Sequence, residues 1–184
     1  SIKKATFMTT WLRMTLISLV AVLCSSCATL KSPRGANLQL DAAWVVLPTI
    51  NNTETPQAGG RMDSILSSLL HIHGVTNLSL VAPSQDNNDL FETADRRQQQ
   101  DALAQARQQG ANYAVAAAVN EWRYKVGLDG EPAVGVSISI IDVASGQVVW
   151  SGTAARTGWS REAVSAIAQK ATDKLLNDAL SNTQ

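Results

Sequence analysis

Cysteine is almost absent from this 184-residue chain, and both cysteines, Cys24 and Cys27, lie within the first 27 residues. A disulfide framework is therefore excluded for the rest of the chain. Histidine is equally scarce, because His71 and His73 are the only two. Residues two apart on a helix point to different sides, so this pair does not predict a shared metal site. We expect neither a bound metal nor a cofactor.

Familiar catalytic patterns are missing as well. The chain has no G-x-S-x-G nucleophile motif and no Walker loop with its lysine. Asp129 and Glu131 lie in one turn, and nothing predicts that they face each other across a cleft as the paired carboxylates of a glycosidase do. Asp86 and Asp89 lack the glycine and the closing glutamate of a calcium loop. We therefore expect a protein that is not an enzyme.

The whole chain carries no net charge, with 15 basic and 15 acidic residues. Lys3, Lys4 and Arg13 all precede Cys27, and no acidic residue does. A mature chain that begins at Cys27 therefore keeps 12 basic and 15 acidic side chains, a net charge of about −3. That balance argues against a nucleic-acid partner and favours a cationic one.

The first 27 residues have the features of a bacterial lipoprotein signal. Arg13 precedes the apolar stretch 16–23, and Ser25 and Ser26 supply the small residues before Cys27. This stretch is too short to span a bilayer, which takes about 20 helical residues. An ordinary secretory signal or an anchor helix is the alternative. Because Ala28 follows Cys27, with no aspartate to retain the protein in the inner membrane, we expect a palmitate-bearing anchor on the periplasmic side of the outer membrane.

Residues 1–7 precede the first methionine, and we expect them to lie upstream of the true start, so that 1–27 is the signal. Residues 28–40 show no apolar period and predict a flexible linker. A single periplasmic domain of residues 41–184 then follows.

Apolar periodicity predicts an α/β (α+β) domain with a mixed β-sheet and packed helices in the order βαβαβββα. Strands are expected at 43–47, 78–81, 113–126, 134–140 and 147–155, with helices at 62–70, 95–109 and after a cap at Ser160. The last helix turns six residues to the core: Val164, Ile167, Ala168, Ala171, Leu175 and Ala179.

Tryptophan is the abundant aromatic residue, with five copies against two tyrosines and two phenylalanines. Trp44, Trp122 and Trp150 lie in predicted strands, where packing explains them. Trp159 lies in a polar loop just before a helix. Its ring either folds back beside the helix start or is exposed, and an exposed tryptophan in a lipid-anchored protein favours the membrane interface.

Four segments carry a resemblance to a known family: PTINNTETPQ at 48–57, WRYKVGLDGEPAVG at 122–135, DVASGQVVW at 142–150 and GWSRE at 158–162. The chain resembles the PelC family, outer-membrane lipoproteins of the Pel exopolysaccharide secretion system. The resemblance implies a fold like the TolB N-terminal domain and a homo-oligomeric ring, a dodecamer, beneath the outer membrane. It also implies an outer-membrane porin with a periplasmic repeat scaffold as partner.

The same resemblance implies that an acidic funnel in the ring guides a partly cationic exopolysaccharide. Carried onto this chain, Cys27 becomes the lipid anchor and Trp159 the membrane-facing aromatic. Asp129 and Glu131 become the funnel acids by their place in the motif.

Two other functions remain open on the same fold. A lipoprotein can activate a peptidoglycan synthase, or it can form part of a curli-type secretion machine. A self-sufficient pore would need long amphipathic strands that this sequence does not have to spare. A cell-envelope glycan hydrolase would need an acid and a base, and the sequence predicts no such pair.

Overall fold

The computed structural model describes residues 28–31, 37–81, 93–126 and 130–181. Within these residues, three helices and seven strands follow one another in the order β1 (Ala28–Lys31), β2 (Ala43–Val46), β3 (Ile50–Asn51), α2 (Ala58–Ile72), β4 (Asn77–Leu80), α3 (Thr93–Gln108), β5 (Tyr113–Tyr124), β6 (Pro132–Asp142), β7 (Val148–Thr157) and α4 (Val164–Leu180). The expected order βαβαβββα is present, and β1 and β3 are additions to it.

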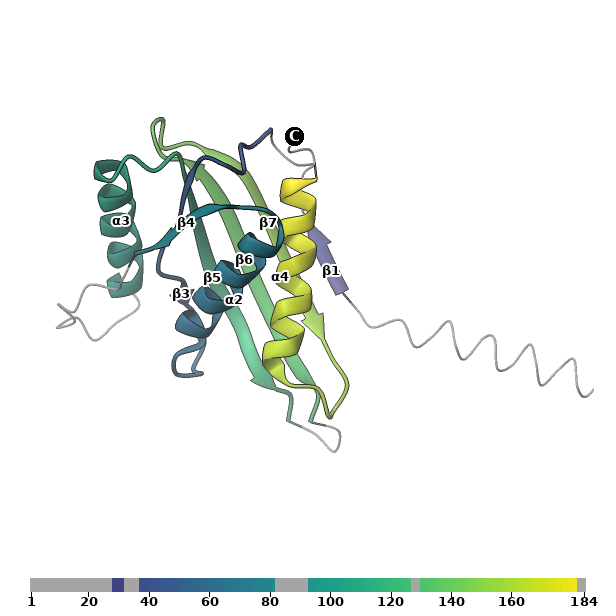
Figure 1. Cartoon of the computed structure of the whole chain (residues 1–184). Coiled ribbons are helices and arrows are strands. Elements are labelled where there is room, and N and C mark those ends of the chain that lie inside the picture. Colours follow the sequence, from purple (N-terminus) through teal and green to yellow (C-terminus); the bar gives the residue numbers. More distant parts are fainter. Residues whose placement is uncertain (1–27, 32–36, 82–92, 127–129, 182–184) are drawn as a thin grey trace, which may run out of the picture.

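All strands belong to one mixed sheet (Figure 1), in the order β1-β7-β6-β5-β2-β4, with β3 paired to β5. β2 is parallel to β4 and to β5, since helices connect these strands. β5, β6, β7 and β1 are antiparallel neighbours. The predicted mixed sheet with packed helices is confirmed.

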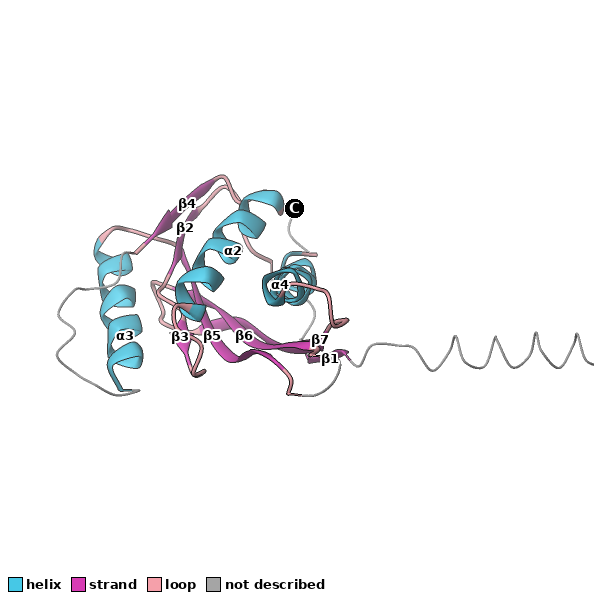
Figure 2. Cartoon of the chain, turned by 90° about the horizontal axis from the view of Figure 1, so that it is seen from below, coloured by secondary structure: helices cyan, strands magenta, loops and turns pink. Residues whose placement is uncertain are grey.

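Helices α2 and α4 cover one face of the sheet (Figure 2). α2 turns Met62, Ile65, Leu66 and Leu70 to the core, and the six predicted core residues of α4 are all buried. Gly74, with a positive φ of 96°, follows the end of α2, a position that favours glycine. This layer contains most of the buried apolar side chains, including Trp44, Trp122 and Trp150.

A smaller cluster lies on the opposite face, where α3 packs on β2 and the start of β5. Ala102 and Ala106 of α3 meet Val45, Leu47 and Ala114 there. The rest of this face carries small hydroxyl side chains. Serine and threonine bond across the strands, at 3.0 Å for Ser139–Ser151 and 3.4 Å for Ser137–Thr153.

The sequence predicts a flexible linker at 28–40, and the structure differs from this prediction at both ends of the segment. Residues 28–31 form β1 on the edge of β7, and Leu38 is buried in the core. The indole N–H of Trp44 also donates to the carbonyl of Gln39, at 2.8 Å. Edge pairing uses backbone groups alone, so it needs no apolar period that the sequence could reveal.

The start of α4 was wrongly predicted. The helix begins at Val164 with Ala163 as its N-cap, and Ser160 lies in a turn before it. In that turn the N–H of Trp159 donates to Oε2 of Glu162 (2.8 Å), and the N–H of Glu162 donates to the carbonyl of Trp159 (2.9 Å). The Glu162 carboxylate thus bonds the loop before the helix instead of lying in its first turn.

Candidate functional site

Two predicted site residues come together at one end of the sheet, where the β5–β6 hairpin lies beside the β7–α4 loop (Figure 1). The N–H of Lys125 donates to the carbonyl of Glu131, at 2.7 Å. The next residue after Glu131, Pro132, accepts a hydrogen bond at its carbonyl from the N–H of Gly158, at 2.9 Å. These bonds bring Glu131 and Trp159 to the same end of the molecule.

Trp159 is exposed to 69 %, so its ring does not fold back against the start of α4. Its backbone is held by Glu162, and the preceding residue must be small. A Cβ on Gly158 would approach Cδ1 of Ile167 to 2.4 Å and Oε2 of Glu162 to 2.6 Å. The loop is therefore fixed while the indole ring points away from the core.

The electrostatics of this loop centre on Glu162. Its carboxylate accepts a hydrogen bond from Nζ of Lys170 and another from the N–H of Trp159. The pKa of Glu162 is lowered, first by the Lys170 hydrogen bond and then by the Trp159 N–H. The residue is ionised at neutral pH, and its carboxylate links the loop to Lys170 of α4.

Sequence reasoning missed two exposed apolar residues at this end. A period of two puts Tyr124 and Val126 on the same side of the strand as Trp122, but only Trp122 is buried. Tyr124 is 52 % exposed, with its hydroxyl donating to the carbonyl of Glu162 at 3.3 Å, and Val126 is fully exposed. The strand here runs past the helices that cover the sheet. The position of Tyr124 and Val126 near the tip of a hairpin is the only sequence signal for their exposure.

The other predicted site residues differ in how far the structure describes them. Glu131 is half-buried at the hairpin. Cys27 and Asp129 lie outside the described residues, as do Asp86 and Asp89.

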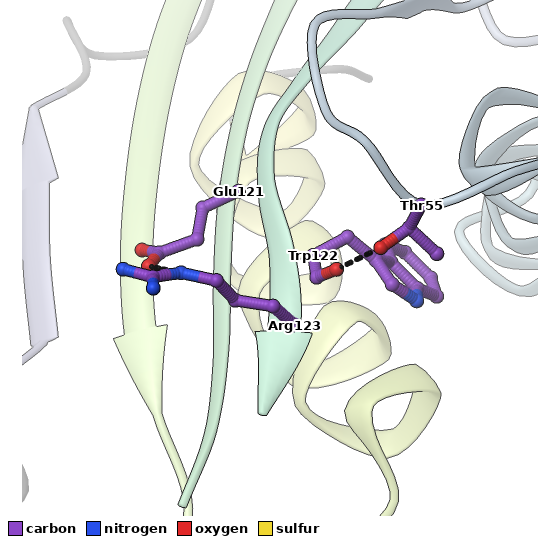
Figure 3. A network of polar contacts seen from close by, with 4 residues as sticks. All are labelled: Thr55, Glu121, Trp122 and Arg123. Carbon is purple, nitrogen blue, oxygen red and sulfur yellow. Dashed lines mark hydrogen bonds and ion pairs between the residues drawn. The ribbon is translucent and has the colours of Figure 1, made fainter. Parts of the chain in front are cut away.

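A β-bulge interrupts β5 between Val119 and Glu121. The extra residue turns Trp122 back to the core face that Val119 occupies. Beside it Arg123 Nε contacts Glu121 Oε1 at 2.9 Å, and the hydroxyl of Thr55 donates to the carbonyl of Trp122 at 2.5 Å (Figure 3).

An open groove of about 900 Å³ runs past this bulge, with Thr55, Glu121, Arg123, Gly135 and Thr153 among its lining. The lining combines the Glu121–Arg123 ion pair with threonine hydroxyls and apolar side chains such as Val136. The hydroxyls of Thr55 and Thr153 bond backbone carbonyls and not a base.

The two histidines are apart, as predicted. Nδ1 of His71 bonds the carbonyl of Val75 (2.9 Å), while Nε2 of His73 contacts Asp173 of α4 (2.9 Å). Within the described ranges no cluster of three or more potential ligands could hold a metal ion. In the same part of the chain, no helix combines the length and the apolar character needed to cross a membrane.

Comparison with known proteins decides the family. A family model described as peptidoglycan-synthase activator LpoB matches residues 38–155. A solved structure of a PelC dodecamer from Paraburkholderia phytofirmans is 37% identical, with a TM-score of 0.69 over 83% of this chain and 98% of that one. The chain belongs to the PelC family, within the wider LpoB-like family.

Other comparisons agree with the PelC fold. A second crystal form of the Paraburkholderia PelC dodecamer, carrying one substitution, gives a TM-score of 0.68 at 37% identity, over 82% of this chain and 97% of that one. Lipoprotein GNA1162 from Neisseria meningitidis shares the fold at 17% identity, with a TM-score of 0.53 over 74% of this chain and 96% of that one. No curated protein matches the chain.

Proposed function

We propose that this PelC-family protein is a ring-forming, non-enzymatic subunit of an apparatus that exports the Pel exopolysaccharide. The observation that carries the proposal is the 37% identity, across nearly the whole of the relative, to a protein whose solved structure is a dodecamer. The open groove, which pairs no nucleophile with a base, fits a guiding role better than a catalytic one.

Guidance of the polymer is electrostatic in this proposal. A mature subunit carries a net charge of only about −3, but twelve copies would carry about −36 around one path. Many weak contacts with a cationic polysaccharide then retain it without trapping it, as conduction requires. Asp129 and Glu131 are the proposed funnel acids.

The proposed anchor is Cys27, acylated in the periplasmic leaflet of the outer membrane, with Trp159 entering the membrane interface. The exposure of the Trp159 ring supports this role, because an indole is favoured at the interface. Glu131 lies at the same end as Trp159, so the funnel acids would surround the mouth of the ring that faces the membrane. That is where the polymer must pass to an outer-membrane porin, the proposed partner.

The funnel is tested by an Asp129→Asn, Glu131→Gln double variant assayed for polymer secretion. We expect secretion to fall several-fold while the ring still assembles, because each ring loses 24 negative charges. An Asp41→Asn, Asp101→Asn double variant removes the same charge from exposed positions elsewhere and serves as control. Normal secretion with an intact ring in the first variant, or an equal loss in both, refutes the role of these two acids.

The LpoB family match over residues 38–155 favours a second candidate, activation of a peptidoglycan synthase. A pull-down from membranes separates the two functions. Recovery of a peptidoglycan synthase supports activation, whereas recovery of an outer-membrane porin with a repeat scaffold supports export.

A further inference from the structure

Helices α2 and α4 cover one face of the sheet (Figure 2), and on the other face a row of polar side chains runs from the end of β3 to β7. Nδ2 of Asn52 donates to Oδ1 of Asn120 at 2.9 Å, and Nδ2 of Asn120 donates to Oγ of Ser137 at 3.0 Å. The Ser137 hydroxyl donates to Oγ1 of Thr153 at 3.4 Å, and the Thr153 hydroxyl donates to the carbonyl of Val136 at 3.1 Å. We name Asn52, Asn120, Ser137 and Thr153 the polar row.

The direction of these hydrogen bonds decides what the polar row offers to a ligand. A hydroxyl group has one proton and two acceptor lone pairs. Ser137 and Thr153 each donate their proton within the protein and each accept one hydrogen bond, so an acceptor lone pair remains on each oxygen. A ligand that bonds these two oxygens must therefore bring the donors.

The polar row leads into the open groove at the β5 bulge, because Asn120 and Thr153 belong to the lining of that groove. The same lining contains two carboxylates, Glu54 and Glu121, and a single basic side chain, Arg123. The groove thus has a formal net charge of −1. Hydrogen-bond acceptors and a negative charge lie side by side on this face.

The ion pair in the groove uses only part of the Glu121 carboxylate. Nε of Arg123 contacts Oε1 at 2.9 Å, and within the described ranges no hydrogen bond or ion pair reaches Oε2. Glu121 and Arg123 extend to one side of β5, and the ring of Trp122 lies on the other (Figure 3). The Glu121 side chain is 32 % exposed. An ammonium group can therefore contact Oε2 while the pair with Arg123 stays in place.

The groove lacks the large apolar anchors that a protein partner buries at the centre of an interface. Among the described residues, none of the exposed large apolar side chains lines it, and the one tryptophan of the lining, Trp122, is buried. A shallow surface rich in acceptors suits a ligand that carries many hydroxyl groups and a positive charge.

We propose that this groove is a subsite for an amino sugar with a free ammonium group, one unit of a cationic polysaccharide. Glu121 accepts a hydrogen bond from the ammonium group, and Thr153 and Ser137 accept from sugar hydroxyls. The inference rests on the proposed export function and adds a binding site on each subunit to the funnel acids. Arg123 offsets part of the Glu121 charge, so the unit is held weakly enough to move on, as conduction requires.

Isothermal titration calorimetry at low salt tests the subsite with the mature chain and two probes, a glucosamine hexamer and its fully N-acetylated counterpart. Acetylation removes the positive charges and leaves the ring hydroxyls in place. We expect the glucosamine hexamer to bind about two- to fivefold more tightly, the effect of an exposed ion pair. Equal affinities for the two probes would overturn the proposal.

Two substitutions in the groove have opposite expected effects on binding of the glucosamine hexamer. Glu121→Gln weakens it about two- to fivefold, and Arg123→Gln strengthens it by a similar factor, because the second change frees the carboxylate from its cation. Asp101→Asn and Arg96→Gln remove the same charges from exposed positions on α3 and serve as controls. A purely structural ion pair would weaken binding in both groove variants. That result, or equal effects of Glu121→Gln and Asp101→Asn, contradicts the subsite.

Gly135→Ala places a methyl group in the groove at an ordinary contact distance, 3.4 Å from Cβ of Glu121, so the fold tolerates it. We expect several-fold weaker binding of both hexamers, with thermal unfolding unchanged. Gly60→Ala, where a Cβ meets nothing within 4 Å, is the matched control. Light scattering of the same samples reports the alternative occupant. A folded Gly135→Ala variant that no longer assembles would show that a second copy fills the groove, and would overturn the subsite.

Ring assembly and polymer secretion separate this inference from the proposed function. Hexamer binding that the groove variants leave unchanged, in a protein that assembles and secretes, refutes the subsite and leaves the export proposal standing. A wild-type chain that neither assembles nor supports secretion refutes export, and with it the polymer that the subsite is proposed to bind.

Discussion

At the scale of single residues, folding shifts the pKa values of two carboxylates, Glu162 and Asp63, in opposite directions. Glu162 has a lowered pKa because Lys170 and the Trp159 N–H stabilise its charged form. Its contribution to stability is therefore present above its unfolded pKa and is lost as the pH falls through the folded value. Asp63 has a raised pKa, since burial disfavours its charge more than hydrogen bonds from Thr49 favour it.

An Asp63→Asn variant tests this assignment. The folded state of the wild type binds more protons than the unfolded state between the ordinary aspartate pKa of 3.8 and the raised folded value, so its stability falls as the pH rises through that window. Asparagine keeps an oxygen that can accept the Thr49 N–H and has no charge to bury. We expect the free energy of unfolding of the variant, relative to wild type, to increase from about pH 4 to about pH 7 in denaturant titrations. A difference that does not change with pH contradicts the burial of a charge at Asp63.

At the scale of elements, periodicity predicted most of the fold but not its edges. The apolar faces of α2 and α4 and the alternation of β6 recur along the sequence, so they were visible in it. β1 and the two-residue β3 were not, because they are held by backbone pairing to strands that lie far away in the chain. The start of α4 differs from the predicted one because the Glu162 carboxylate bonds the N–H of Trp159 in the preceding loop, and the helix begins only at Val164.

The candidate site also contains residues that the sequence could predict and residues that it could not. Trp159 could be singled out from its polar setting, and its exposure agrees with one of the two alternatives. Tyr124 and Val126 could not, since they lie on the same side of the strand as the buried Trp122 and the sequence does not show where the covering helices end. The pairing of Ala28 with Arg156 depends on register, which no local pattern of residues encodes.

The junction between β7 and α4 gives a prediction at this scale. Gly158→Ala forces a methyl group against Ile167 and Glu162, and we expect it to lower the free energy of unfolding by about 1–3 kcal/mol. Gly60→Ala in α2 is the matched control, because a Cβ there meets nothing within 4 Å. Alanine is the better helix former, so the control is neutral or stabilises by up to about 1 kcal/mol. Denaturant titration of both variants measures the difference, and equal stabilities would contradict the close packing of the loop.

At the scale of the whole molecule, the ends of the sheet have different roles. One end gathers the exposed side chains of Tyr124 and Trp159, Glu131 and the start of β1, and it is the proposed membrane side. A face of the sheet next to that end carries the open groove at the β5 bulge, with the ion pair of Glu121 and Arg123 in its lining. The small negative charge of one subunit acts on a polymer only if many copies surround the same path.

Assembly into a ring is therefore the central claim, and size-exclusion chromatography with light scattering on the chain from Ala28 onward tests it most directly. We predict a single species with twelve times the mass of the monomer, as the related PelC dodecamer suggests. A chain that remains a monomer at every concentration would contradict the ring and remove the multiplied charge on which guidance of the polymer depends.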